Sequence, residues 1–587
     1  MSVALSRLVA PLAFAFAAGL TACSSDVRRF PLRDPVWKDA DLAPVSVDCQ
    51  LDQDSVGKLR CAPASSGPSS AQSAASRLET SSFLAESARE ALNVNSVDEV
   101  PDSAWFTNRI GVRALTPEDI VRGPCGDRDL DPDAPDGAWV IDRGSLPGEP
   151  PSFRVDVAGL GKFVLSIDSA QQPERATGAA ATATRLYHAA GYWVPCESVV
   201  HVRPAIFKLT PGLTLADDRG GARAFDAAAL AQLLASASSR GGLARMIASR
   251  ALPGRTLGSF SYEGTRRDDP SDVVAHEDRR DLRGARVLAA WLGHERASEH
   301  STRDTWLAQR EGESEALLSP GVVRHYQVGL GACLGSEEES DGASHRLGRV
   351  DQLDLAQEAT DPILTGILER PGGRASRSAR GDIFGDFSAG DLEPRRWQSG
   401  YPNPAFARMS ELDGAWSARS LARFTPELVE AAVRAGDFTL ARHTGFLIEQ
   451  LLLRREALLR RYLARVSPIA DLRLSGEDLC GKDLGRSTRV FTDTDFAYRA
   501  RAYAGADLAH HSSPAVRPGA DGSLCLSVAH VADDSGAPDD SASRYVVIDI
   551  FNGVAPGPLR AHLYDLGPRR GFRLVGIERP DDDSPPS

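Results

Sequence analysis

Three short segments between residues 138 and 167 constrain the fold of this chain more than any other feature. They cover 138–142, 153–157 and 162–167, are rich in β-branched and aromatic residues, and are separated by glycine-containing stretches. Such runs, broken by turn residues, indicate β-strands joined by short connections. A helical pattern over 174–191 and another strand-like run at 198–202 follow. This order predicts a small antiparallel sheet with one helix.

The rest of the chain divides into two further parts. From 225 to about 463 the pattern predicts mainly helix, and 447–466 places apolar residues on one side and arginines on the other. That arginine face is better explained as a solvated surface than as a lipid-binding one. After Pro468, strand-like runs return at 489–503, 523–531, 545–551 and 572–577. We therefore expect an α+β protein that ends in a separate β module.

These changes of pattern set the predicted boundaries, and the length of 587 residues fits two or three domains. We expect a signal peptide over 1–22, an anchor, linker and short helix over 23–94, a sheet-containing lobe over 95–215, a helical lobe over 216–468, a β module over 469–579 and a disordered tail over 580–587. The short helix is expected at 77–92, after a linker at 62–76 that is rich in Ala, Ser, Gly and Pro.

The N-terminus carries the motif Leu20-Thr21-Ala22-Cys23, which follows an apolar run too short to span a bilayer. It resembles the lipobox of bacterial lipoproteins, in which the cysteine is acylated and becomes the first residue after cleavage. The resemblance implies lipid attachment at Cys23, export, and a body held on a membrane. Ser24 after the cysteine favours the outer membrane, facing the periplasm or the cell surface. An ordinary signal peptide is the alternative.

Charge and cysteines narrow the possible partners. The net charge of −13 argues against a nucleic-acid partner. With no CxxC motif or Cys/His ladder, the sequence offers no zinc site, and we expect no metal or other cofactor.

Export permits disulfides, and of the possible pairs Cys49 with Cys61 is the most local. Seven cysteines remain besides Cys23, and because seven is odd at least one of them stays unpaired. They are Cys49, Cys61, Cys125, Cys196, Cys333, Cys480 and Cys525.

The region from 266 to 304 contains the most distinctive motifs. They are Arg-Arg-Asp-Asp-Pro-Ser-Asp at 266–272, His-Glu at 276–277, Arg-Arg-Asp-Leu-Arg at 279–283 and Ala-Ala-Trp-Leu-Gly-His at 289–294. Together with Trp-Phe-Thr-Asn-Arg at 105–109 and His-Tyr at 325–326, they resemble an uncharacterised family of bacterial envelope proteins with a protein-kinase-like, HipA-like core. The resemblance covers roughly 95–470. It implies two lobes, a small sheet with a helix and a larger helical lobe, with nucleotide normally bound between them.

Phosphoryl transfer by such a fold needs a strand lysine, a helix glutamate, an H-x-D-x-x-x-x-N loop and a D-F-G aspartate. When the family pattern is laid on this chain, His294 is kept, but the other positions lack the chemistry. They hold Ser166 for the lysine, Ala180 for the glutamate, Arg296 for the loop aspartate, Ser301 for the asparagine and Gly329 for the D-F-G aspartate. The losses predict a pseudokinase without a catalytic residue.

Other residues offer weaker chemistry. Lys162 could stand in for the lost lysine, but four residues is ~13 Å along a strand. Glu295 and Glu299 flank the loop and could supply a relocated base, although ion pairs with Arg296 or Arg303 are the simpler expectation. His276, His294, His300 and His325, with Glu277 and Glu295, match no metal-ligand spacing. We interpret Arg266 to Pro270 as an ion-paired turn that holds the fold.

The sequence therefore predicts a membrane-anchored, pseudokinase-like scaffold that binds an envelope protein partner. The periplasm is not supplied with ATP, which agrees with that prediction. One alternative is an active but atypical transferase or nucleotide-binding protein that uses Glu295, Glu299 and Asp304. The other is a purely structural envelope protein. Within the loop, Arg296 is expected to pair with one of those three carboxylates and to fill the space of a metal ion.

Overall fold

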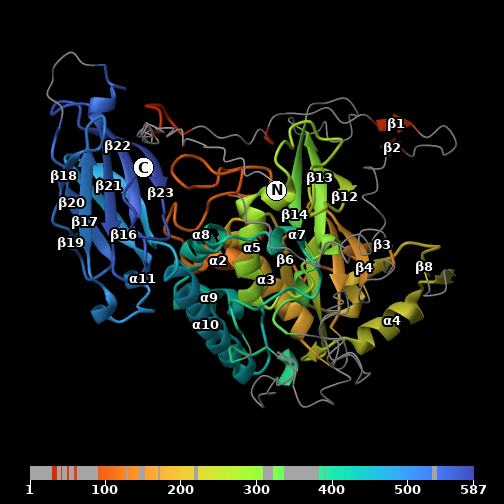
Figure 1. The fold of residues 1–587 in the computed structure, drawn as a ribbon. Coiled ribbons are helices and arrows are strands. Elements are labelled where there is room, and N and C mark those ends of the chain that lie inside the picture. The colour runs from red at the N-terminus through yellow and green to blue at the C-terminus, as the bar shows by residue number, and fades with distance from the viewer. Residues whose placement is uncertain are drawn as a thin grey trace, which may run out of the picture.

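The computed structural model describes residues 29–35, 41–42, 49–51, 59–61, 90–126, 130–144, 152–168, 172–216, 222–308, 321–335, 382–385, 387–390, 392–531 and 538–586. Over these residues the protein is α+β, as expected, with several sheets and a group of packed helices (Figure 1). Cys23, the predicted signal peptide and the linker at 62–76 lie outside them. Of the helices described, none has the length and apolar character needed to cross a membrane.

The first large sheet has the strand order β10-β11-β5-β4-β3-β7, with β6 paired to β11. All pairs are antiparallel except β3 with β7. Alternate residues of β3, β4 and β5 point into a core that includes Trp139, Phe153 and Leu165, and helix α4 covers it through Leu230 and Leu234. The elements are β3 Trp139–Arg143, β4 Ser152–Val157, β5 Gly161–Ser166, β6 Glu197–Val202, β7 Phe207–Leu209, α4 Ala227–Ser236, β10 Ser239–Arg240 and β11 Leu243–Arg250.

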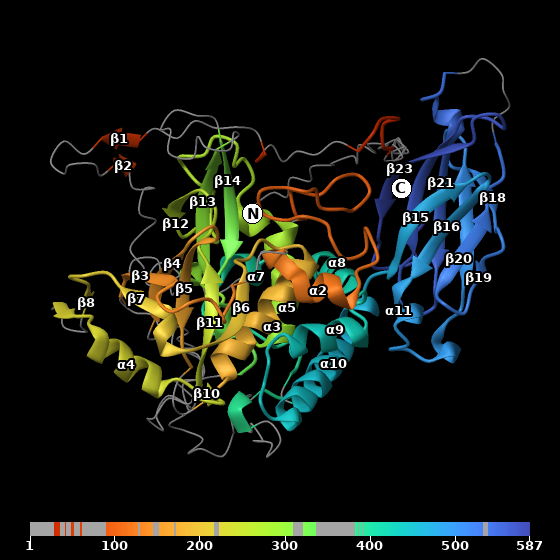
Figure 2. The ribbon, with the colours of Figure 1, turned by 180° about the vertical axis from the view of Figure 1, so that it is seen from behind.

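Helix α3, Arg175–Ala190, connects β5 to β6 and is buried over almost its whole length (Figures 1 and 2). Its small residues allow this, because bulkier side chains would hold the neighbouring elements away. At Gly178, a β-carbon would lie 2.4 Å from the ring of Phe438, which follows helix α9. Arg245 of β11 strengthens the same contact by donating to the carbonyl oxygens of Gly436 and Asp437, each at 2.6 Å. The helical part of the chain therefore packs directly on α3.

A second, three-stranded sheet and the helices form the centre of the molecule. The antiparallel order is β12-β13-β14, and the largest apolar core lies among α3, α5, α8, α9 and α10. The elements are α2 Pro117–Arg122, β12 Arg255–Gly258, α5 Arg280–Leu292, β13 Thr302–Ala308, β14 Gly321–Gln327, α7 Pro404–Ala407, α8 Glu411–Leu421, α9 Pro426–Arg434 and α10 Ala441–Leu463. Two short hairpins, β1 Cys49–Leu51 with β2 Leu59–Cys61 and β8 Thr214–Ala216 with β9 Ala222–Ala224, lie outside this core.

The C-terminal β module consists of two sheets, in the orders β15-β16-β20-β19 and β18-β17-β21-β22-β23. Their facing side chains, among them Leu479, Leu526 and Ile548, form a separate core. Cys480 and Cys525 lie opposite each other on β16 and β20 and form a disulfide. The elements are β15 Ile469–Ser475, β16 Asp478–Asp483, α11 Leu484–Ser487, β17 Arg499–Ala504, β18 His510–Ser512, β19 Arg517–Pro518, β20 Ser523–Ser527, β21 Tyr545–Phe551, β22 Leu559–Asp565 and β23 Phe572–Glu578.

The structure corrects predictions at two places in the chain. The first part of the region 225–463 is not mainly helical, since β10 to β14 lie between residues 239 and 327. Strand β11 pairs with β5, so the boundary expected at 215/216 cuts through the first sheet. The helix expected at 77–92 lies outside the described residues, apart from 90–92, which are not helical. The tail beyond 580 is placed against the β module, where Asp583 pairs with Arg499 and Arg501 at 3.0 and 2.8 Å. Opposite charges on β17 explain why it docks.

A buried ionic network joins the β module to the rest of the molecule. Asp98 adopts a left-handed backbone with φ 60° and accepts hydrogen bonds from Arg280 of α5, Arg419 of α8 and Arg579, which follows β23. Arg579 also donates to the carbonyl oxygens of Ser467 and Ile469, at the start of the module. Burial alone would raise the pKa of Asp98, but the three guanidiniums hold it well below its usual value.

We predict that Arg579→Met destabilises the protein by about 3 kcal/mol or more, because it leaves part of a buried charge network uncompensated. The measurement is urea unfolding of the full chain. Arg517→Met is the matched control, since Arg517 forms an exposed pair with Asp478 in the same module and should contribute less than about 1 kcal/mol. Equal and small losses for the two variants would show that Asp98 does not hold the module in place.

Candidate functional site

The two positions expected to hold a lysine and a glutamate lie on either side of β11. Ser166, at the end of β5, is directly opposite Ile247 of β11. Ile247 in turn packs against Ala180 and Ala181 of α3 in a small apolar cluster. The structure thus brings positions 166 and 180 to one place in the fold, as a strand–helix ion pair would require. The side chains there are a hydroxymethyl group and a methyl group, so no charge is available to grip a phosphate.

His294 is buried and connects the end of α5 to α3. Helix α5 ends at Leu292, and Gly293 after it adopts the left-handed conformation that favours glycine. The Nδ1 atom of His294 then lies 2.9 Å from the hydroxyl oxygen of Tyr187. Burial lowers the pKa of His294 to about 4, so the imidazole is neutral near pH 7. In this position the ring acts as a packing and hydrogen-bonding group inside the core.

The other two loop positions, Ser301 and Gly329, are also neighbours. The backbone N–H of Val328 donates to the carbonyl oxygen of Ser301 at 2.9 Å. A β-carbon at Gly329 would lie 3.7 Å from Ser301 Oγ. Ser301 Oγ itself donates to the carbonyl oxygen of Arg296 at 2.7 Å and so closes the loop on itself. The hairpin of β13 and β14 separates the two positions in sequence, and its strand pairing returns them to one place.

The expected ion pair between Arg296 and a loop carboxylate is wrong. Arg296 is exposed, and its side chain has no ion pair within the described part of the chain. Asp304 is fully buried on β13 and belongs instead to Arg266, at 2.8 Å, and to His325, at 2.7 Å. The alternation of side chains along β13 explains this, because Asp304 points to the face of the sheet opposite to that of Arg303.

A buried arginine takes the space next to the position of the D-F-G motif. Arg175, in the first turn of α3, donates to the carbonyl oxygens of Gly331, Cys333 and Gly335 at 3.3, 3.4 and 2.9 Å. Its guanidinium therefore fixes the segment after Gly329 to the helix. Positive charge at this point disfavours a divalent cation. Sequence reasoning did not single out Arg175, because nothing local distinguishes it from a solvated helix arginine.

The motif at 266–272 is an ion-paired turn, as the sequence predicted. Arg266 contacts Asp268 at 2.9 Å. Its backbone N–H also donates to Asp272, which accepts a second hydrogen bond from His276 Nε2 at 2.7 Å. Burial raises the pKa of Asp272, but the hydrogen bond and charge of His276 outweigh it and hold the pKa below its usual value.

Trp105 is the centre of this buried cluster. Its ring stacks on His325 with 3.5 Å between the centroids, lies 4.5 Å from that of His276, and packs under the guanidinium of Arg279 at 5.0 Å. His294 lies elsewhere, against Tyr187, and His300 is exposed. No three His, Cys, Asp or Glu side chains among the described residues form a group that could hold a metal ion. His276 and His325 therefore support the fold through their buried contacts.

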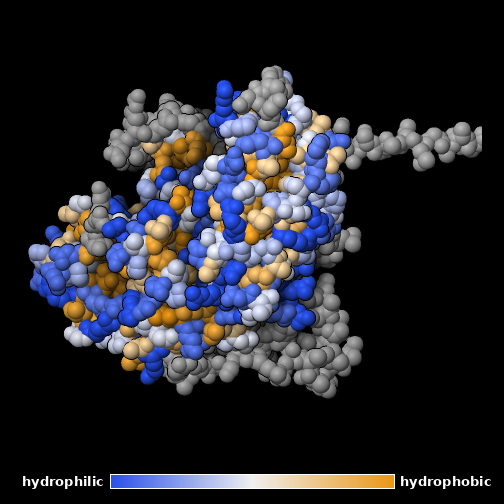
Figure 3. Space-filling model, turned by 90° about the vertical axis from the view of Figure 1, so that its left-hand side faces the viewer, coloured by the Kyte–Doolittle hydropathy of each residue, from blue (hydrophilic) through white to orange (hydrophobic). Residues whose placement is uncertain are grey.

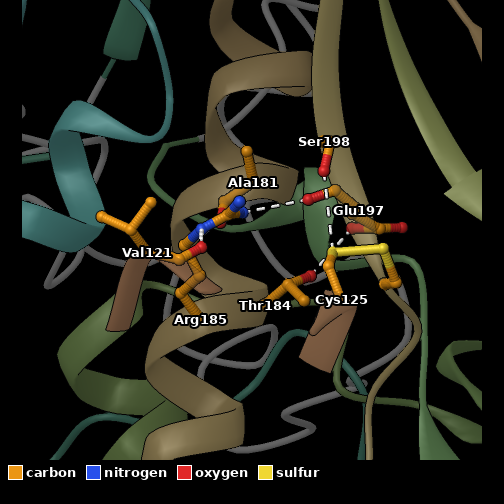
Figure 4. Close-up of a disulfide and its surroundings, with 8 residues drawn as sticks. Val121, Cys125, Ala181, Thr184, Arg185, Glu197 and Ser198 are labelled. Atoms are coloured by element: carbon orange, nitrogen blue, oxygen red, sulfur yellow. Dashed lines mark hydrogen bonds between the residues drawn. A yellow bond between two sulfur atoms is a disulfide. The ribbon is translucent and has the colours of Figure 1, made fainter. Parts of the chain in front are cut away.

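A disulfide lies beside the second half of α3 (Figure 4). Cys125 bonds to Cys196, just before β6, a pairing that the sequence left open. Beside it, Thr184 donates to the buried carboxylate of Glu197 at 2.9 Å, and Arg185 donates to the carbonyl oxygens of Val121, Ala181 and Glu197. Burial raises the pKa of Glu197. Cys333 is the unpaired cysteine of the described residues and is buried. The backbone register of β1 and β2 sets Cys49 opposite Cys61.

Neither a protein-family model nor a curated protein nor a solved structure matches this chain. The resemblance to envelope proteins with a HipA-like core therefore stays a prediction.

We predict that His294 makes the protein less stable in mild acid. Its pKa of about 4 lies below the ordinary value of 6.5, so between these values the unfolded chain binds the proton more readily and stability falls as the pH falls. Between pH 7 and pH 5 the loss is about 2 kcal/mol. In His294→Gln that part of the loss should disappear, as measured by urea unfolding at both pH values.

His300→Gln is the matched control, because His300 is exposed in the same loop and should leave the pH dependence unchanged. If His294→Gln lost as much stability between pH 7 and pH 5 as the natural chain, the buried neutral imidazole would be contradicted.

Proposed function

We propose that the protein is a lipid-anchored envelope protein with a pseudokinase-like core, which acts by binding a protein partner and transfers no phosphate. The observation that supports this most directly is the contact at Ile247. There the strand position Ser166 and the helix position Ala180 both lie next to Ile247, and neither carries the charge that the lysine and the glutamate of a kinase would supply.

The order of the elements supports a kinase-like core. In kinases the lysine lies on the third strand, the glutamate on the next helix, and the catalytic loop and the D-F-G segment come later in the chain. Here Ser166 ends β5, the third strand of the β3-β4-β5 meander, and α3 follows it. His294 follows α5, and the β13–β14 hairpin separates Ser301 from Gly329. The positions are kept in order while their chemistry differs.

The same positions argue against metal and nucleotide binding. Mg²⁺ in such sites is held by carboxylates and phosphate oxygens. Positions 296 and 329 supply an exposed arginine and a glycine, and Arg175 occupies the carbonyl oxygens that follow. A small cavity lined by Tyr192, Trp416 and Phe424, among others, has no charged side chain in its lining, so it offers a phosphate no opposite charge.

The alternative of an atypical transferase has less support. Asp304 is buried between Arg266 and His325 and is not free to act as a base. Glu299 accepts a hydrogen bond from Ser261 at 3.0 Å. Lys162 is half exposed and lies 3.6 Å from Asp142, on the outer part of β5, so it does not replace the missing lysine. The alternative of a purely structural envelope protein leaves the kinase-like order of positions without a reason.

We predict that millimolar Mg-ATP does not shift the melting temperature of the natural chain. A ligand at a hundred times its dissociation constant stabilises the folded state by ~2.7 kcal/mol, a readily measured effect. Ser166→Trp tests whether any bound nucleotide lies at the predicted lysine position. Lys208→Trp is its control, because Lys208 is the exposed residue of β7 in the same sheet. A magnesium-dependent shift that Ser166→Trp abolishes and Lys208→Trp keeps would favour the transferase.

We also predict that Cys23 carries the lipid. Cys23→Ser should leave the protein unprocessed or release it from the membrane fraction, because the acylated thiol is lost. The measurement is membrane fractionation with detection of the precursor and mature sizes. Ser24→Ala is the control and should keep processing and sedimentation. A Cys23→Ser chain that is matured and sedimented like the parent would contradict the anchor.

A further inference from the structure

The outer face of the five-stranded sheet of the β module is apolar and is covered by the N-terminal segment. Tyr503, Leu508, Tyr545, Val547, Tyr564 and Val575 form this face, on the side away from the module's own core. Phe30 and Leu32 pack against it. We call residues 29–34 the strap. Figures 1 and 2 show the strap, in red, beside the β module.

Specific contacts hold the strap in place. The backbone N–H of Phe30 donates to the hydroxyl of Tyr545 at 2.9 Å, and the hydroxyl of Tyr564 donates to the Phe30 carbonyl oxygen at 3.1 Å. The ring of Phe30 lies 4.8 Å from that of His562. A β-carbon at Gly576 would lie 2.4 Å from the Phe30 ring, so only glycine leaves room for it there. The strap is therefore a built contact across β21, β22 and β23.

The strap also limits how far the β module can lie from a lipid on Cys23. Phe30 is the seventh residue after Cys23, and a fully extended chain spans at most about 25 Å over that length. Among the described residues that follow the strap, the next docked one is Asp41, whose carboxylate contacts Arg279 of the helical part at 3.2 Å. If only Asp41 held the chain, the reach would be about 65 Å. Phe30, rather than Asp41, sets the distance to the membrane.

The residues around the strap suit a bilayer surface. The chain as a whole has a charge of −13, but several exposed arginines lie on the strap or near the β22–β23 turn. They are Arg29, Arg33, Arg569, Arg570 and Arg573. Arg573 pairs with Asp34 and Arg570 with Asp539, both at exposed positions where lipid phosphates can compete. Figure 3 shows the side of the molecule that lies on the left in Figure 1, where hydrophilic and hydrophobic residues are mixed.

We propose that the strap holds the β module against the membrane, with this arginine-rich edge on the lipid headgroups, so that the kinase-like core is presented away from the bilayer. The inference rests on the lipid anchor of the proposed function. The partner of the arginine-rich edge is then the phosphate-bearing face of a bilayer.

Energy transfer to an acceptor lipid tests the orientation. The acylated full chain is reconstituted in vesicles that contain anionic phospholipid, with a donor dye on an azide-bearing residue. Ser543→p-azidophenylalanine places the dye beside β21, and Lys208→p-azidophenylalanine places it on β7; both residues are exposed. Transfer from residue 543 should be about twofold or more that from residue 208, because seven residues hold the module within about 25 Å.

Phe30→Asp tests whether the strap is the cause. It should reduce transfer from residue 543 toward that of residue 208, whereas the control Pro31→Ser, at an exposed strap position, should keep the difference. Equal transfer from residues 543 and 208 in chains with the natural strap would overturn the inference, even if Phe30→Asp failed to fold. If the chain did not join the vesicles at all, the anchor, and with it the proposed function, would fail instead.

Discussion

Asp98 is the residue on which the arrangement of the whole molecule depends. It has a strained left-handed backbone and a buried carboxylate that three arginines share, one each from α5, from α8 and from the end of β23. Removing such a charge from water is costly unless it is paired, so the arginines and the carboxylate need one another. The same stretch of chain continues to Trp105, which centres the ionic cluster at the β13–β14 sheet. One short segment thus positions three parts of the fold.

The positions that the proposed pseudokinase interpretation assigns lie close together in the core built on this frame. Ser166 and Ala180 both lie next to Ile247, and Ser301 lies next to Gly329. His294 is used to join α5 to α3, and Arg175 ties the segment after Gly329 to the same helix. Under the proposed function these side chains are consistent with one another, because each packs or bonds within the protein rather than facing a phosphate or a metal. A binding role on an anchored body agrees with that pattern.

Local patterns predicted part of this structure well. The strands at 138–167, the helix at 174–191 and the strands at 545–551 and 572–577 are present within about a residue, because alternation and turn residues determine them locally. The residues of β11, Leu243–Arg250, favour helix by composition, and only pairing with β5 and β6 makes them a strand. Local patterns are limited in the same way at the candidate site. The substituted positions could be named from their spacing, but the partners of Asp304, Arg175 and Asp98 could not, because they come from segments far apart in sequence.

The central claim is that the kinase-like positions form no seat for a nucleotide. Amide hydrogen exchange of the full chain, with and without Mg-ATP, tests this claim at the positions themselves. The account predicts unchanged exchange in peptides covering 161–180, 293–301 and 327–335. Slower exchange in all three segments that requires both magnesium and ATP would contradict it.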